Sequence, residues 1–165
     1  MPNIEIELNP VDFITIGTIG PKGQRVFHLQ AGKADQIVSM IIEKEQAWAL
    51  SEAIRELTDD LDQRYPDDSE TEVDYSMDLH EPIEPLFRVA QMGLGYEEER
   101  NLIVLVAQEL LIIDEDTDPE GLEPGIVRMW STRAQMRALS AHSTMVVQAG
   151  RPDPKLNGRL VYYWT

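Results

Sequence analysis

Alternating apolar and polar positions in the first third of the chain predict β-strands joined by tight turns. Apolar residues alternate over 14–19, a glycine and proline cluster interrupts them at 20–23, and an apolar stretch resumes at 26–31. Alternation broken in this way is typical of a strand–turn–strand unit. The β-branched run at 37–42 predicts a third strand.

After residue 43 the apolar spacing changes to steps of three and four, which predicts one face of an amphipathic helix. The positions on that face are Ala47, Leu50, Ile54, Leu57 and Leu61. Several aspartates and then Pro66 follow, and they are expected to end the helix.

Residues 37–51 recur as residues 126–140. Seven of the fifteen positions are identical at a constant offset of 89. Self-similarity at a fixed offset indicates a duplicated structural unit. Apolar segments at 87–92 and 102–113 precede the second copy, and they predict its first two strands, with the third over 126–130.

A second helix is expected to begin at Thr132 with a capping box. In this motif the Thr132 hydroxyl accepts from the backbone N–H of Gln135, and the glutamine side chain reaches back to the helix start. The apolar face of this helix is expected to comprise Met136, Leu139, Ser143 or Met145, and Val146. Gly150 and Pro152 then end it.

Each unit therefore consists of three strands followed by a helix. We expect a single α+β domain of two βββα repeats, at about 12–63 and about 86–149, related by pseudo-twofold symmetry. A mostly antiparallel sheet would carry both helices on one face. The acidic segment at about 64–85 is expected to be a linker or long loop.

Apolar residues near each end of the chain predict two further strands. Ile4, Ile6 and Leu8 predict an added N-terminal strand. The run Leu160–Trp164 predicts a strand within a C-terminal tail at 150–165.

Charge is unevenly distributed over the 165 residues, which carry a net charge of -16. Acidic residues concentrate in 59–85 and 97–123, whereas basic residues predominate after Gly125. A phosphate backbone would be repelled, so we expect no nucleic-acid partner. The acidic loops either confer solubility or meet a basic partner.

Other features of the composition narrow the class of protein. The chain has no cysteine, which excludes disulfides and thiolate chemistry. It has no apolar run long enough to span a membrane, and its N-terminus lacks the pattern of a signal peptide. We therefore expect a cytoplasmic protein with no membrane partner.

Three motifs superficially suggest ligand sites. The glycines at 17–23 resemble a phosphate loop, but a strand follows where a helix is needed, so a hairpin turn is favoured. The carboxylates of 114–119 resemble a calcium loop, but Pro119 replaces its required glycine. The three histidines, His28, His80 and His142, share no zinc-ligand spacing. We expect no metal and no cofactor.

The two helix openings supply the candidate site residues. A ligand pocket between the repeats would be lined by Glu43, Lys44, Gln46, Arg133 and Gln135. Gln30 and Gln108, both late in a second strand, are interpreted as a further matching pair. Helix capping and buried hydrogen bonding explain the glutamines equally well without a ligand.

Several segments together resemble an uncharacterised bacterial repeat-protein family, the domain of unknown function 3090. The segments that carry the resemblance are Thr18–Gly23, Arg25–Ala31, Ile42–Leu50, Phe87–Val89, Met92–Leu94 and Ala149–Pro152. They extend over nearly the whole chain. The resemblance implies no activity and no catalytic residue.

Many members of that family carry a Cys-x-x-Cys-Gly knuckle after the Gly-Arg-Pro step, and the knuckle resembles half of a zinc ribbon. In this chain Pro154 and Asn157 stand at the two cysteine positions, followed by Gly158. The resemblance therefore implies that this member lacks the knuckle. The aromatic strand at 160–164 is a candidate replacement for it.

The sequence favours a non-catalytic binding or adaptor protein whose partner is an unidentified protein or small molecule. The alternative is an enzyme that acts on a small phosphorylated or cationic substrate in the cleft between the repeats. A homodimer formed through Tyr162, Tyr163 and Trp164 is a further hypothesis, because an exposed aromatic edge strand favours pairing.

Overall fold

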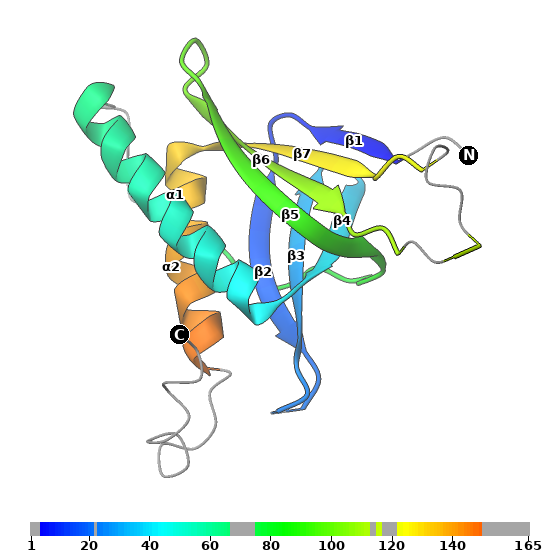
Figure 1. The fold of residues 1–165 in the computed structure, drawn as a ribbon. Coiled ribbons are helices and arrows are strands. Elements are labelled where there is room, and N and C mark those ends of the chain that lie inside the picture. The colour runs from blue at the N-terminus through cyan, green and yellow to red at the C-terminus, as the bar shows by residue number, and fades with distance from the viewer. Residues whose placement is uncertain (1–3, 22, 67–74, 113–114, 117–121, 150–165) are drawn as a thin grey trace.

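The computed structural model describes residues 4–21, 23–66, 75–112, 115–116 and 122–149. Within them the chain forms an α+β fold of seven strands and two helices (Figure 1). In chain order the elements are β1 (Glu5–Leu8), β2 (Phe13–Ile19), β3 (Val26–Lys33), β4 (Gln36–Ile42), α1 (Lys44–Arg64), β5 (Pro85–Glu97), β6 (Leu102–Glu109), β7 (Ile126–Thr132) and α2 (Arg133–Ala149).

The seven strands form one mixed sheet in the order β1-β7-β6-β5-β4-β3-β2. Strands β2, β3 and β4 form one antiparallel meander, and β5, β6 and β7 form another. The meanders join through the parallel pair β4–β5, and β1 pairs with β7 in parallel. The sheet is thus mostly antiparallel, as expected.

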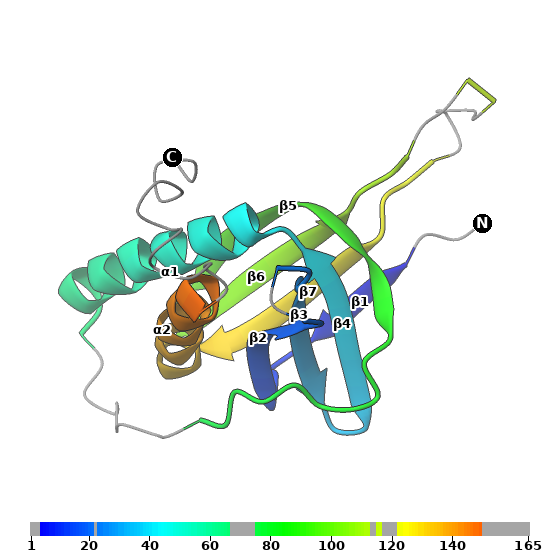
Figure 2. The ribbon, with the colours of Figure 1, turned by 90° about the horizontal axis from the view of Figure 1, so that it is seen from below.

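The sheet is strongly curved, so that its two ends approach each other (Figure 2). Strands β1 and β2 lie at opposite ends of the strand order, yet only residues 9–12 separate them. The Val11 N–H donates to the carbonyl oxygen of Trp130 on β7, and the next N–H, of Asp12, donates to Gly32 on β3. The N–H groups of two consecutive residues, Val11 and Asp12, therefore connect the two ends of the sheet.

Both helices lie side by side against the same side of the sheet (Figures 1 and 2). Serine side chains hold them together: Ser140 Oγ donates to the Ser51 carbonyl at 2.7 Å, and Ser143 Oγ donates to that of Ala47 at 2.9 Å. Small side chains allow this close approach. The helices consequently pack with the C-terminal half of α2 beside the N-terminal half of α1.

The core fills the space between the helices and the concave side of the sheet. Its most deeply buried members, at most 1% exposed, include Ile16, Leu29, Met40, Leu105, Met129, Ile54, Met136 and Leu139. Burying a side chain of this size stabilises the fold by about 1.5–3 kcal/mol. These residues hold both helix N-termini against the sheet.

Most predicted elements are confirmed, with two corrections. The second predicted strand of the second unit ends at Glu109 rather than residue 113, and the Leu110 N–H still donates to the Arg88 carbonyl on β5. On α2, Met145 is 62% exposed and Val147 is buried instead, because α2 turns that face to α1 and β2. The predicted strand at 160–164 lies outside the described residues.

Candidate functional site

The start of α1 places two of the predicted site residues against β5. The Gln46 side chain caps its helix, since its Oε1 accepts from the Glu43 N–H at 2.7 Å. Its amide Nε2 donates to the carbonyl oxygens of Val89 and Ala90 at 3.1 and 3.3 Å. Glu43 pairs with Arg88 at 2.6 Å on the surface. Gln46 therefore fixes the helix start to the strand.

The start of α2 repeats this arrangement with Gln135. Its side-chain oxygen accepts from the Thr132 N–H at 2.8 Å, and its own N–H donates to Thr132 Oγ1 at 3.0 Å, which confirms the predicted capping box. Its amide donates to the carbonyl oxygen of Val11 at 3.3 Å. Gln135 thus fixes α2 to the segment that leads into β2.

Arg133 has a side chain only 1% exposed, and it connects three elements. Its Nη1 donates to Asp62 Oδ1 at 3.1 Å and to the Tyr65 carbonyl at 2.8 Å, both at the end of α1. Its Nη2 donates to Asn101 Oδ1, in the β5–β6 turn, at 2.8 Å. Both terminal nitrogens are therefore engaged within the chain, whereas the buried Nε has no hydrogen-bond partner among the described residues.

The five predicted site residues therefore divide into two groups. Lys44, the half-buried first residue of α1, belongs to the same helix start as Glu43 and Gln46. Arg133 and Gln135 contact the end of α1, the β5–β6 turn and the start of β2. Among the described residues, Gln46 lines one pocket and Gln135 lines another.

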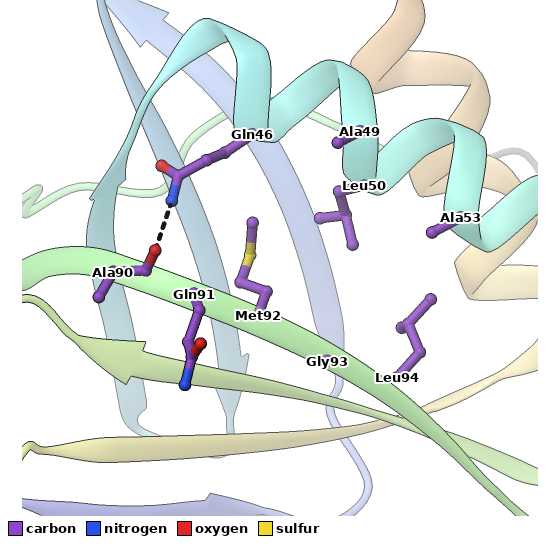
Figure 3. A pocket seen from close by; sticks show the side chains of 9 residues that line it. All are labelled: Gln46, Ala49, Leu50, Ala53, Ala90, Gln91, Met92, Gly93 and Leu94. Atoms are coloured by element: carbon purple, nitrogen blue, oxygen red, sulfur yellow. Dashed lines mark hydrogen bonds between the residues drawn. The ribbon is translucent and has the colours of Figure 1, made fainter.

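The first of these, the α1–β5 pocket, has a volume of about 350 Å³. Figure 3 shows α1 above it and β5 below, with side chains from both directed into the space between them. Its lining residues are Gln46, Ala49, Leu50, Ala53, Ala90, Gln91, Met92, Gly93 and Leu94. None of the nine has a titratable side chain. Four of them are alanine or glycine, and the small size of these residues creates the hollow.

The second, the β2 pocket, has a volume of about 210 Å³ and includes Gln135 in its lining. The other lining residues are Asp12, Phe13, Ile14, Tyr75, Ser76, Met77 and His80. One wall thus comes from residues 75–84, a non-regular segment that we call the strap. The α1–β5 pocket has no strap residue in its lining.

The strap covers a row of buried polar side chains on the convex side of the sheet. Thr15, Gln30 and Ser39 lie opposite one another on β2, β3 and β4, and each is at most 2% exposed. Thr15 Oγ1 donates to the Met77 carbonyl at 2.7 Å. Gln30 donates to the His80 carbonyl at 2.8 Å and accepts from the His80 N–H at 2.7 Å.

Close packing reinforces these bonds. The His80 ring stacks on Phe13 with 3.8 Å between ring centroids. A Cβ on Gly17 would lie 2.7 Å from Leu79 Cγ, so glycine is needed where the strap crosses β2. The predicted linker is therefore packed on the sheet over 75–84. The signal for this in the sequence is the polar Gln30 within an apolar strand.

A family model described as "Protein of unknown function (DUF3090)" matches residues 6–159. The chain belongs to that family. Neither the curated proteins nor the solved structures contain a significant match to it. The predicted resemblance to this family is confirmed, and the two cysteine-equivalent positions Pro154 and Asn157 lie outside the described residues.

In this DUF3090 member, the register corrects one interpretation of the glutamines. Gln30 lies opposite Ser39, whereas Gln108 lies opposite Ile126. With the offset of 89, the counterpart of Ser39 is Arg128, which lies opposite Val106. Gln30 and Gln108 therefore occupy different positions in their meanders. Of the two glutamines, Gln30 is the one that bonds to the strap.

Burial lowers the pKa of two histidines. The pKa of His28, on β3, is lowered because its ring is desolvated, although a hydrogen bond with the Val26 carbonyl opposes the shift. The pKa of His142, on α2, is lowered by burial against a hydrogen bond to Ile16 and the charge of Asp78. Among the described residues, no group of three or more His, Asp or Glu side chains could hold a metal ion. No helix in this part of the chain could span a membrane.

Proposed function

We propose that this protein is a non-catalytic binding protein and that the α1–β5 pocket is its ligand site. The observation that carries the proposal is the chemistry of the lining: apolar side chains, four of them alanine or glycine, and two glutamines. Pockets for small ligands are largely apolar and range from about 300 to 1,000 Å³. This one is large enough for a single aromatic or branched aliphatic group.

Both glutamines of the lining are engaged within the chain, and the Gln91 side chain points away from the pocket (Figure 3). Gln46 is held by its two backbone partners, and Gln91 Nε2 donates to Gln108 Oε1 at 2.8 Å. General acid–base or nucleophilic catalysis needs a titratable or activated group beside the reacting atoms. The lining has none. A neutral apolar ligand suits this lining best, because none of its side chains carries a charge.

The alternative, an enzyme with its site between the repeats, requires the two helix openings to face one substrate. Gln46 and Gln135 line different pockets, and the Arg133 side chain is engaged by Asp62, Tyr65 and Asn101. These placements favour binding over catalysis. The unidentified partner, the cytoplasmic location and the tail-mediated homodimer stay predictions.

The proposal includes an origin by duplication, with β2-β3-β4-α1 and β5-β6-β7-α2 as two βββα repeats related by a pseudo-twofold axis. Two parallel pairs support it, since β4 meets β5 as β7 meets β1. Met40 and Met129, at the offset of 89, lie opposite Leu29 and Leu105 respectively. The α1–β5 and β2 pockets then become counterparts, each with one capping glutamine.

Titration with a neutral fluorescent apolar probe, N-phenyl-1-naphthylamine, tests the ligand site. We expect saturable binding that Ala53→Trp weakens at least about tenfold, because the indole fills the pocket. Ala141→Trp is the matched control, an exposed alanine on α2 outside the lining, and it should leave the affinity unchanged. If the native chain, Ala53→Trp and Ala141→Trp bound the probe with equal affinity, the proposal would be contradicted.

A further inference from the structure

Strand β5 has a neighbouring strand on its β4 side over only part of its length. The pairing with β4 extends from Pro85 to Arg88, because β4 ends at Ile42. The rest of β5, Val89–Glu97, pairs with β6 on its other side. Within the part of the chain that the structure describes, no strand lies along the β4 side of Val89–Glu97. We call this side the β5 edge.

Backbone hydrogen-bond directions alternate along β5. The Leu110 N–H donates to a β5 carbonyl, so the even-numbered residues of β6 face β5. Val106 is one of these residues, and it lies opposite Gly93. Gly93 therefore bonds to β6, whereas its neighbours Met92 and Leu94 direct their N–H and carbonyl groups to the β5 edge.

The start of the β5 edge has a hydrogen-bond donor, but its middle has none among the described residues. Gln46 donates to the carbonyl oxygens of Val89 and Ala90. The N–H and carbonyl groups that Met92 and Leu94 direct to the edge receive no partner from the described residues. Backbone groups are strong donors and acceptors, so an unpaired strand edge favours pairing with another strand.

The α1–β5 pocket lies directly against this unpaired segment. Met92 and Leu94 belong to its lining, and Figure 3 shows their side chains directed from β5 toward α1. Two contacts hold α1 to β5 on either side of the pocket. One is the Gln46 bond to Ala90, and the other is the pair of rings Tyr65 and Tyr96, with 5.5 Å between centroids.

An unpaired strand edge beside an apolar pocket suits an extended peptide. Peptides that bind by strand addition take affinity from main-chain hydrogen bonds and specificity from pockets for alternate side chains. Residues 91–95, between the two contacts, span about 17 Å at about 3.4 Å per residue. The edge therefore accommodates about five residues of an added strand, one of which places its side chain in the pocket.

Charge narrows the choice of peptide. The net charge of -16 repels a second copy of this chain and any acidic segment. Glu56 is exposed one helical turn beyond the lining residue Ala53, which places a further carboxylate beside the pocket. A neutral or basic segment of another protein, with an apolar side chain for the pocket, matches these charges.

We propose that the α1–β5 pocket binds an extended, non-acidic peptide segment of a partner protein. The segment adds to the sheet as a strand along the β5 edge and inserts an apolar side chain beneath α1. This inference rests on the proposed function of the pocket, and it names the class of ligand.

Selection from a phage-displayed library of random heptapeptides on the native chain provides the probe. We expect enriched peptides with apolar residues at every second position and no net negative charge. N-methylation of successive amides in the strongest binder, measured by fluorescence anisotropy, should lower the affinity at least about tenfold at every second position only. No enrichment, or a loss that does not alternate, would overturn the inference.

Proline at position 92 tests the same edge from the protein side. Met92→Pro removes an N–H that faces the β5 edge and leaves the β5–β6 ladder intact, since proline is tolerated where the N–H faces away from a neighbouring strand. The matched control Met92→Ala shortens the same side chain and keeps the N–H. We expect the proline variant to bind the selected peptide at least about tenfold more weakly than the alanine variant.

Equal affinities of Met92→Pro and Met92→Ala would contradict strand addition. Circular dichroism shows whether both variants are folded, and the N-methylated peptides test the native chain independently of either variant. A native dimer that Met92→Pro dissociates, seen by light scattering, would also overturn the inference, because a second copy would then occupy the edge.

The probe N-phenyl-1-naphthylamine separates this inference from the proposed function. If Ala53→Trp abolishes probe binding but the library yields no peptide, strand addition is rejected and the pocket stays a ligand site. If Ala53→Trp alters the binding of neither the probe nor a selected peptide, the site itself is rejected.

Discussion

Arg133 shows how a residue that suggests ligand binding in the sequence can serve the fold instead. A cation at a helix start is unfavourable near the positive end of the helix dipole, so its presence there suggests a special role. The structure supplies that role, because Asp62, Tyr65 and Asn101 receive the guanidinium and link α1, α2 and the β5–β6 turn. Its environment, rather than its residue type, determines what it does.

We expect Arg133→Met to lower the free energy of unfolding by about 2–3 kcal/mol, because the part-buried oxygens of Asp62, Tyr65 and Asn101 all lose a charged donor. Urea denaturation measures this. Arg137→Met is the matched control: Arg137 pairs with the same Asp62, but its side chain is 32% exposed, so the loss should stay below about 1 kcal/mol. Equal losses from both variants would contradict the structural role of Arg133.

The lowered pKa values of His28 and His142 predict a pH dependence of stability. Both residues have an ordinary pKa of 6.5 in the unfolded chain and a lower one in the folded chain. Below about pH 6.5 the unfolded state therefore binds more protons, and the free energy of unfolding falls as the pH decreases.

Urea titrations at about pH 7.5 and about pH 5.5 should show a smaller pH-dependent loss for His28→Asn than for the native chain, since the variant lacks one titrating group. Protonation of carboxylates affects both proteins alike, so the difference between them isolates the histidine. A loss as large in the variant as in the native chain would refute the assignment.

At the scale of elements, the helices and most strands follow from local patterns. The periodic residues of α1 are nearly all buried, and the Thr132–Gln135 capping box forms as its sequence predicts. The strap could not be predicted in this way. Its contacts with Thr15 and Gln30 cross 62 and 50 residues of sequence, so no local period reports them.

We expect Gln30→Leu to release the strap, because the N–H and carbonyl of His80 both lose their partner. Limited proteolysis should cut within residues 75–84 at least about tenfold faster than in the native chain, since cleavage follows the population of the opened segment.

Gln108→Leu makes the same chemical change at a residue whose side-chain bond, with Gln91, lies at the surface. It should leave the cleavage rate of the strap unaltered. Faster cleavage in both variants would show that Gln30 does not hold the strap specifically.

At the scale of the whole molecule, the net charge of -16 acts against the compact fold. Acidic residues repel one another across the surface, whereas the ion pairs within the described residues, such as Glu43–Arg88, are mostly exposed. Exposed pairs contribute little, so repulsion should dominate the electrostatic energy of the native state.

We therefore expect the melting temperature to rise when salt increases from about 0.01 M to about 0.15 M, which shortens the Debye length from about 30 Å to about 8 Å. Thermal unfolding followed by circular dichroism measures this, with sodium chloride and potassium chloride compared to exclude a specific ion effect. A fall in melting temperature would mean that ion pairs outweigh repulsion.

The sequence alone determined the kinds of element, their order, the capped helix starts and the membership of the DUF3090 family, because period, capping and family motifs are local properties of the chain. Only the tertiary structure decided which residues meet. In the folded chain Val11 and Asp12 connect the two ends of the sheet, and the Arg133 side chain is buried. The strap packs on Gln30, and a pocket forms between α1 and β5. Each of these depends on contacts between residues far apart in the sequence, and the energy of such a contact exists only once the chain has folded.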